Sequence, residues 1–118
     1  MSDRGDFLRL ADIHDQIGFI ERAIRGKSEA DFLSDRELYQ AVAFSLQVIG
    51  EADNNLSVET RSKAAEIPWP KVIALRNRIS HGYFALELTE IWRIAINDAP
   101  ALKSSLTAAG LEPPADIG

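Results

Sequence analysis

The chain has 118 residues, two histidines, no cysteine and a formal net charge of −5 at pH 7. At this length we expect one domain, residues 1–118, whose single core buries roughly two thirds of the unfolded surface. The acidic balance argues against a general nucleic-acid-coating role, which needs a basic face. Without cysteine there is no disulfide or thiolate zinc site, and two distant histidines do not favour a histidine metal site. We therefore expect chemistry without a metal ion or another cofactor.

The first six residues, Met-Ser-Asp-Arg-Gly-Asp, lack the apolar core of a signal peptide. No apolar run approaches the roughly 20 residues that a membrane-spanning helix needs. These two features predict a cytoplasmic protein with no membrane segment.

Apolar residues recur at helical spacing along most of the chain, and we find no strand pattern. The first predicted helix, of about 18 residues, carries this apolar stripe: Leu10, Ile13, Ile17, Ile20 and Ile24. Gly26 closes it, and residues 27–34 are predicted to be a polar connection. Ser34 or Asp35 is expected to cap a second helix over residues 36–54.

The second predicted helix is apolar on two neighbouring faces. One face is formed by Leu38, Val42, Ser45, Ile49 and Ala52, and the other by Ala41, Phe44 and Val48. A helix that is apolar over so much of its circumference is buried on two sides. Either the second side contacts a partner subunit, or the helix lies at the centre of its own bundle.

Ser57 is expected to cap a short third helix. The sequence Pro-Trp-Pro at 68–70 then interrupts the helical pattern. Trp69 precedes a proline and is therefore expected to be extended, whereas the second proline suits the first turn of a fourth helix. We predict that this helix runs to about His81 and that Gly82 ends it.

A fifth helix is predicted to begin near Leu88, with Pro100 kinking or dividing it. Its expected core residues are Leu88, Ile91, Trp92 and Ala95. Residues 110–118 are expected to be a frayed tail. The predicted architecture is all-α, a small antiparallel bundle of about five helices.

One short segment, from Arg76 to Tyr83, combines arginine, histidine and tyrosine, and reads Arg-Asn-Arg-Ile-Ser-His-Gly-Tyr. This segment belongs to an acid-free run, residues 67–86, that carries a charge of +3 and leaves −8 for the rest of the chain. Arginine matches phosphate oxygens with its planar fork, and histidine transfers protons near neutral pH. The combination of Arg76 with His81 therefore indicates phosphate chemistry.

On a regular helix Arg76 falls within the core-facing sector, so its guanidinium needs a partner, such as Glu51 or a phosphate. Asn77 and His81 are four residues apart and share a face. Arg76 and His81 are five apart, about 140° of turn, so one helix points them in different directions. Either the helix distorts at its end, or two copies of the motif meet across a dimer.

Each of these residues also has a purely structural interpretation. Arg76 alone can be a buried ion-pair residue, and His81 can be a cation favoured by the C-terminal end of the helix dipole. Tyr83 can pack its ring just beyond the helix end and leave its hydroxyl in water.

The motif Arg, four residues, His, any residue, Tyr stands here as Arg76, His81 and Tyr83. With its flanking segments, it resembles the HepT-like toxins of the HEPN superfamily, small all-α ribonucleases paired with minimal nucleotidyltransferase antitoxins. The flanks that resemble the family are Ile49-Gly50-Glu51-Ala52, Ile67-Pro68-Trp69, Ile91-Trp92 and Asp98-Ala99-Pro100-Ala101-Leu102.

This resemblance implies a HEPN-like homodimer in which Arg76 and His81 of two chains form one cleft. It also implies metal-independent RNA cleavage, in which the ribose 2′-hydroxyl attacks the adjacent phosphate and leaves a 2′,3′-cyclic end. His81 would transfer protons, Arg76 would stabilise phosphate charge, and Asn77 would orient His81 or the phosphate. Tyr83 would accept AMP from the cognate nucleotidyltransferase, which silences the toxin.

Two other classes of function remain open from the sequence. The chain can be a non-catalytic subunit that binds a nucleotide or docks the nucleotidyltransferase. It can also be a helical dimerisation module in which the motif is a buried ion-pair network. Nucleotide binding without cleavage would favour the first, and loss of stability without change of activity on mutation of Arg76 would favour the second.

Overall fold

The computed structural model describes residues 2–70, 72 and 88–111, and every regular element within those ranges is helical. The all-α prediction is confirmed. The elements are α1 (Ser2–Ile24), α2 (Glu29–Ser34), α3 (Arg36–Asn54), α4 (Val58–Ser62), α6 (Leu88–Arg93), the π-helical segment η2 (Ile94–Asp98) and α7 (Ala99–Ala108). None of these helices is long and apolar enough to cross a membrane.

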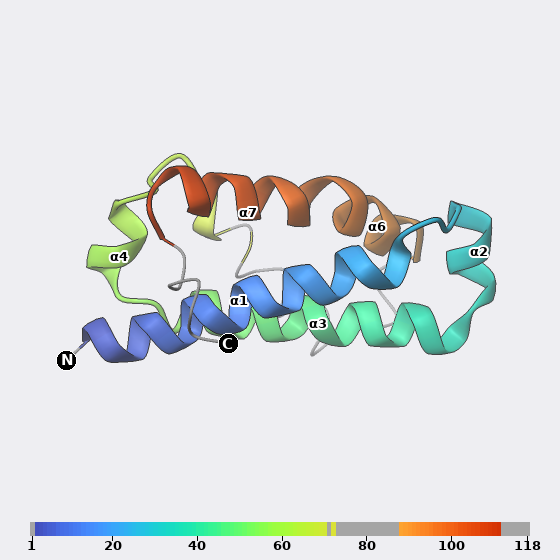
Figure 1. Cartoon of the computed structure of the whole chain (residues 1–118), viewed down its shortest axis with the longest axis horizontal. Helices are drawn as coiled ribbons and strands as arrows, with labels where there is room; N and C mark the ends of the chain where they lie inside the picture. The colour runs from blue at the N-terminus through green and yellow to red at the C-terminus, as the bar shows by residue number, and fades with distance from the viewer. Residues whose placement is uncertain (1, 71, 73–87, 112–118) are drawn as a thin grey trace.

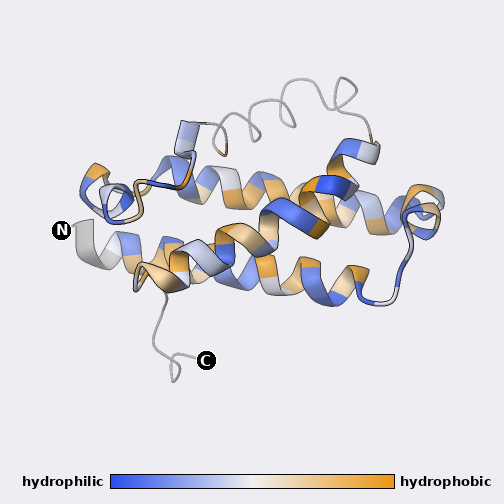
Figure 2. Ribbon diagram, turned by 90° about the horizontal axis from the view of Figure 1, so that it is seen from above, coloured by the Kyte–Doolittle hydropathy of each residue, from blue (hydrophilic) through white to orange (hydrophobic). Residues whose placement is uncertain are grey.

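The long helices α1 and α3 run antiparallel, side by side, and form one layer of the molecule (Figure 1). Helices α6 and α7, joined through η2, form a second layer that crosses over this pair. Apolar and polar residues alternate along the helices when the molecule is seen from above (Figure 2). The short helices α2 and α4 lie at opposite ends of the bundle (Figure 1).

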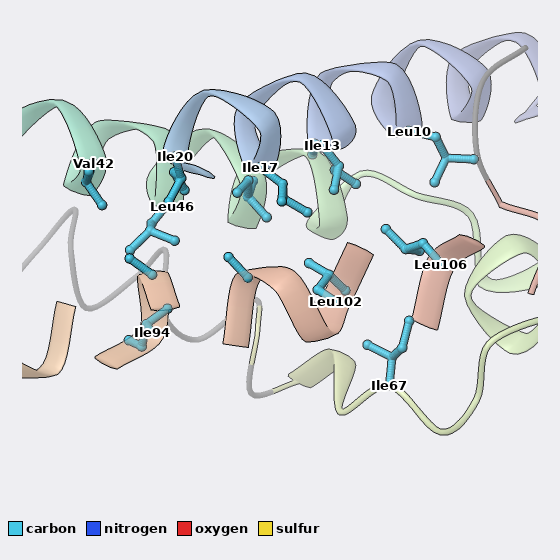
Figure 3. Packing of buried hydrophobic residues seen from close by; sticks show 14 of the residues in the cluster. Leu10, Ile13, Ile17, Ile20, Val42, Leu46, Ile67, Ile94, Leu102 and Leu106 are labelled. Carbon is cyan, nitrogen blue, oxygen red and sulfur yellow. The ribbon is translucent and has the colours of Figure 1, made fainter. Parts of the chain in front are cut away.

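The core lies between these two layers. Ile13, Ile17 and Ile20 of α1 are completely buried, and they point toward Leu102 and Leu106 of α7 (Figure 3). Each side chain of this size contributes about 1.5–3 kcal/mol when it is fully removed from water. The apolar stripe predicted for the first helix therefore forms the centre of the core.

Helix α1 begins earlier than predicted, at Ser2 rather than a few residues before Leu10. Its first turns are fixed by Asp6, which is buried and accepts hydrogen bonds from Ser57 and Thr60. The predicted end is confirmed, because the helix stops at Ile24 and Gly26 has a φ of 75°, a conformation that favours glycine.

The predicted polar connection at 27–34 is wrong, since it contains the six-residue helix α2. Ser28 Oγ accepts a hydrogen bond from the Asp31 amide at 3.1 Å, and Asp31 Oδ2 accepts one from the Ser28 amide at 3.0 Å. This reciprocal pair is a capping box. Phe32 is completely buried, with ring centroids 6.3 Å from Tyr39 and 5.2 Å from Trp92.

Helix α3 spans the range predicted for the second helix, and Asp35 is its N-cap, with Oδ1 accepting from the Leu38 amide at 3.1 Å. Of the first apolar face, Val42, Ser45, Ile49 and Ala52 are buried and Leu38 is half-buried. The second face is covered only in part, because Ala41 and Val48 are half-buried whereas Phe44 is 64% exposed. Helix α3 is therefore not enclosed on all sides by its own bundle.

The predicted cap of the third helix is confirmed, since Ser57 Oγ accepts from the Thr60 amide at 3.1 Å. The extended conformation predicted for Trp69 is wrong, because a helix begins at this residue. The indole Nε1 donates to the carbonyls of Arg61 at 3.0 Å and Ala64 at 3.1 Å, and the ring is buried. These contacts hold Trp69 in place against the local preference set by the following proline.

The predicted division at Pro100 is not found at that residue: α6 continues through the π-helical η2 into α7 without leaving helical backbone, and Pro100 lies in the first turn of α7. The predicted frayed tail is wrong at residues 110 and 111, which close the end of α7, and residues 112–118 lie outside the described residues. Gly110 has a φ of 76°, and the side chain of Leu111 is buried. The Leu111 amide donates to the Leu106 carbonyl at 2.8 Å, which closes the end of α7.

Candidate functional site

The residues singled out for chemistry, Arg76, Asn77, His81 and Tyr83, lie outside the described residues, as do the predicted helix stop Gly82 and the basic residues Lys71 and Arg78. The described chain reaches Val72 before the motif and resumes at Leu88 after it. The structure therefore defines the two ends between which the motif is held.

The segment that leads into the motif is firmly anchored at its start. The Val72 amide donates to the Pro68 carbonyl at 3.1 Å, so the first helical turn is closed. Trp69 fixes this turn to α4 and the following bend through the two bonds of its indole nitrogen. Because the indole is buried and its donor is shared by two carbonyls, the direction in which the chain enters the motif is well defined.

A cavity of about 310 Å³ lies beside this entry. Its walls are apolar and include Leu46, Ile49, Ile67, Val72, Ile94 and Leu102. The charged groups at its edge are Glu66, Glu90, Arg93 and Asp98. Arg93 Nη1 and Asp98 Oδ2 are 3.4 Å apart, so the one guanidinium of the described rim is paired. Three carboxylates and one paired guanidinium at this edge disfavour the binding of an RNA phosphate. The basic residues of the run 67–86 are better placed to bind one.

The outer surface of α1 and α3 carries an exposed apolar patch. Leu8 is 52% exposed and Phe44 is 64% exposed, and both line one open depression together with the half-buried Val48. Arg9, Asp12, Gln47, Glu51, Ala52 and Asn55 complete its lining. Large apolar side chains gathered on one face, with charged neighbours of both signs, are typical of an interaction surface.

Glu51 and His14, the other two polar residues considered from the sequence, both have contacts within the described chain. Glu51, weighed as a partner of Arg76, is exposed, and Asn55 Nδ2 donates to its carbonyl at 2.8 Å and to its Oε2 at 3.3 Å. His14 is half-buried, with Nε2 3.0 Å from the Leu111 carbonyl, which ties α1 to the end of α7. His14 thus has a structural contact that accounts for its position.

Sequence reasoning missed a polar cluster at the α3–α4 junction. Asp53 is completely buried on the last turn of α3, and neither of its carboxyl oxygens has a hydrogen-bond partner. Burial raises its pKa to about 8, although the charge of Arg61 acts to lower it. The available signal was the position of Asp53 four residues after Ile49, on the buried face of α3.

The chain matches the family described as "Ribonuclease HepT-like" over residues 13–109. It is 34% identical over 94 residues to "Probable ribonuclease HepT" of Thermococcus cleftensis, a match that covers 80% of this chain and 86% of that protein. It is 33% identical over 88 residues to "Putative RNase TTE0752" of Caldanaerobacter subterraneus subsp. tengcongensis, covering 75% of this chain and 79% of that protein. No solved structure matches the chain.

Proposed function

The chain belongs to the ribonuclease HepT-like family, and we propose that it is a metal-independent endoribonuclease, the toxin of a toxin–antitoxin pair that acts in the cytoplasm. One observation carries the proposal: the family match over residues 13–109 includes the whole motif from Arg76 to Tyr83. The motif also lies in the longest acid-free run of the chain, which carries a charge of +3 and can accommodate a phosphate.

In the proposed reaction the ribose 2′-oxygen forms a bond to the adjacent phosphorus and the bond to the 5′-oxygen breaks. The proton of the 2′-hydroxyl is transferred through His81 to the leaving 5′-oxygen, which leaves a 2′,3′-cyclic phosphate and a 5′-hydroxyl. Arg76 binds the phosphate oxygens as their charge increases, and Asn77 orients His81 or the phosphate. General acid–base catalysis of this kind contributes typically 10²–10⁴-fold, and the guanidinium fork binds two phosphate oxygens at once.

The proposed active form is a homodimer. Arg76 and His81 point about 140° apart on a regular helix. Two chains can bring them together, because Arg76 of one chain and His81 of the other can line the same cleft. The exposed Phe44 and Leu8 support this assembly, because they leave an apolar face of α3 and α1 uncovered in the single chain.

A matched set of variants tests the catalytic assignment. We expect His81→Ala to lower RNA cleavage by about 10²–10⁴-fold, whereas His14→Ala, which removes the other histidine, keeps it. We expect Arg76→Lys to fail as well, because a point charge does not reproduce the fork, while the exposed Arg22→Lys does not change cleavage. Full activity of His81→Ala or Arg76→Lys would refute the assignment. Nucleotide binding by a wild type that never cleaves RNA would favour the binding-subunit alternative.

Regulation is proposed to occur at Tyr83, through AMP transfer by a cognate minimal nucleotidyltransferase. Each AMP adds an anion close in sequence to Arg76 and His81 and would compete with an RNA phosphate for the same cation. We expect Tyr83→Phe to cleave RNA but to escape silencing when it is co-expressed with the partner. Peptide mass spectrometry locates the modification, and AMP on Tyr39, the other tyrosine, would contradict the proposal.

A further inference from the structure

Asp53 is an unusual residue for the end of a helix inside a small bundle. Its side chain is 0% exposed, and neither Oδ1 nor Oδ2 receives a hydrogen bond. A buried carboxylate without donors is costly, so such a group keeps its proton instead. The raised pKa of Asp53, about 8, has this cause, with burial as its largest contribution. The folded chain therefore carries a neutral Asp53 at neutral pH.

The complementary charge lies on α4. Arg61 is the residue whose charge acts on Asp53, yet no hydrogen bond joins the two side chains. The Nε of Arg61 is itself buried without a partner. Arg61 as a residue is half-buried, so the unpaired buried atoms at the α3–α4 junction are the two carboxyl oxygens of Asp53 and this one nitrogen of Arg61.

The other charged groups at this junction are either bonded or exposed, and Glu59 and Lys63 of the α4 region are exposed. Asp6 of α1 accepts from the Ser57 amide at 3.0 Å and from Ser57 Oγ at 2.6 Å, and Thr60 Oγ1 also donates to it. Burial acts to raise the pKa of Asp6, but these bonds, with a smaller effect of Arg9, hold it below its usual value. On α3 itself, Glu51 is exposed. Arg61 is therefore the group at the junction that can respond when Asp53 loses its proton.

A shift of Arg61 would be transmitted to the entry of the motif segment. The Arg61 carbonyl accepts from Trp69 Nε1 at 3.0 Å and from the Ala64 amide at 3.1 Å. The Ala64 carbonyl in turn accepts from the same indole nitrogen at 3.1 Å. The backbone that carries the guanidinium is thus the backbone that holds Trp69.

We propose that the α3–α4 junction is a proton-dependent latch: neutral Asp53 leaves Arg61 unbonded to it, and ionised Asp53 draws Arg61 toward it and shifts the carbonyls that hold Trp69. An ionised Asp53 must pair or reach water, because an unpaired buried charge is strongly unfavourable. The buried Nε of Arg61, which has no acceptor of its own, is the donor that an ionised Asp53 can attract. The ligand of this latch is a proton, and the inference does not depend on RNA cleavage.

The indole resonance of Trp69 in ¹H–¹⁵N NMR spectra is a direct probe, and Trp92→Phe identifies it because the chain has two tryptophans. In the wild type we expect the chemical shift of this resonance to change as pH rises from about 6 to about 9. The midpoint of this change should equal the midpoint at which the carboxyl carbon of Asp53 titrates. Asp53→Asn, which cannot ionise, should abolish the movement. The exposed Asp12→Asn on α1 is the matched control and should retain it.

Three results would overturn the latch. The first is an Asp53 carboxyl that titrates near the ordinary aspartate value in the folded wild type, an observation that needs no variant. The second is a Trp69 resonance that stays fixed while Asp53 titrates. The third is the same pH-dependent movement in Asp53→Asn. If Asp53→Asn does not fold, Arg61→Gln replaces it, and an unchanged movement of Trp69 in that variant counts against the latch.

Discussion

Asp6 and Asp53 are two buried carboxyl groups at the same end of the bundle, and they differ in their hydrogen-bond donors. Asp6 receives bonds from Ser57 and Thr60, whereas Asp53 receives none. Burial acts to raise the pKa of both, but the bonds hold that of Asp6 below its usual value while that of Asp53 rises to about 8. The presence of donors, and not burial alone, decides which carboxyl is charged.

Asp6 is expected to stabilise the fold in its ionised form. Because its pKa is lowered on folding, its contribution is present above about pH 4 and is lost as pH falls through its folded pKa. Asp6→Ala should lower the free energy of unfolding by about 1–3 kcal/mol at pH 7 and by less at acidic pH. Urea unfolding at the two pH values measures this, with the exposed Asp15→Ala as control. An equal loss at both pH values would contradict the charged role.

Asp53 is expected to have the opposite effect on stability. The pKa of Asp53 is raised in the folded chain. Its contribution to the free energy of unfolding is therefore most favourable below about pH 4 and is lost as pH rises toward 8. Asp53→Asn removes this dependence. The free energy of unfolding of Asp53→Asn minus that of the wild type should therefore increase between pH 5 and pH 8. A difference that is constant over this range would show that Asp53 is already ionised in the fold.

At the level of helices, local signals were sufficient where a cap or a periodic stripe was present. Asp35 and Ser57 cap the helices they were expected to cap, because capping uses residues three apart in sequence. Helix α2 was missed because six residues are too few to show a period, although Ser28 and Asp31 form a recognisable capping box. The early start of α1 depends on a bond between residues 6 and 57, which no local pattern contains.

The candidate site was predictable to a different extent. The spacing of Arg76, His81 and Tyr83 is visible in the sequence alone, because the motif is short and contiguous. The orphaned carboxyl of Asp53 was not, since its burial depends on the tertiary packing around the end of α3. Trp69 was predicted to be extended but is helical, for the same reason. The partners of its indole, the carbonyls of Arg61 and Ala64, lie eight and five residues earlier in the chain, outside the local Pro-Trp-Pro pattern.

The missed helix α2 is expected to be important for stability because of Phe32. This ring is completely buried between Tyr39 and Trp92. Phe32→Ala should lower the free energy of unfolding by about 3–5 kcal/mol, and Val58→Ala, at a position 75% exposed, by less than about 0.5 kcal/mol. Denaturant titrations compare the two. If Phe32→Ala does not fold, Phe32→Leu should still lose more stability than Val58→Ala, and the reverse order would contradict this role for α2.

At the level of the whole molecule, the exposed patch on α1 and α3 accounts for the proposed dimer. Phe44→Glu places a charge at its most exposed apolar position, and we expect it to convert the protein to a monomer without unfolding it. Sedimentation equilibrium measures the mass, and circular dichroism checks the fold. RNA cleavage should fall together with the dimer, because the proposed cleft needs two chains. A monomeric wild type, or a dimeric Phe44→Glu, would exclude this face.

The central claim is that the chain itself cleaves RNA without a metal ion. The most direct measurement is incubation of the purified, unmodified protein with a mixture of tRNA and mRNA in excess EDTA, followed by analysis of the new RNA ends. We expect fragments with 2′,3′-cyclic phosphates from the wild type and none from His81→Ala. Intact RNA in the presence of a folded wild-type dimer with unmodified Tyr83 would contradict it.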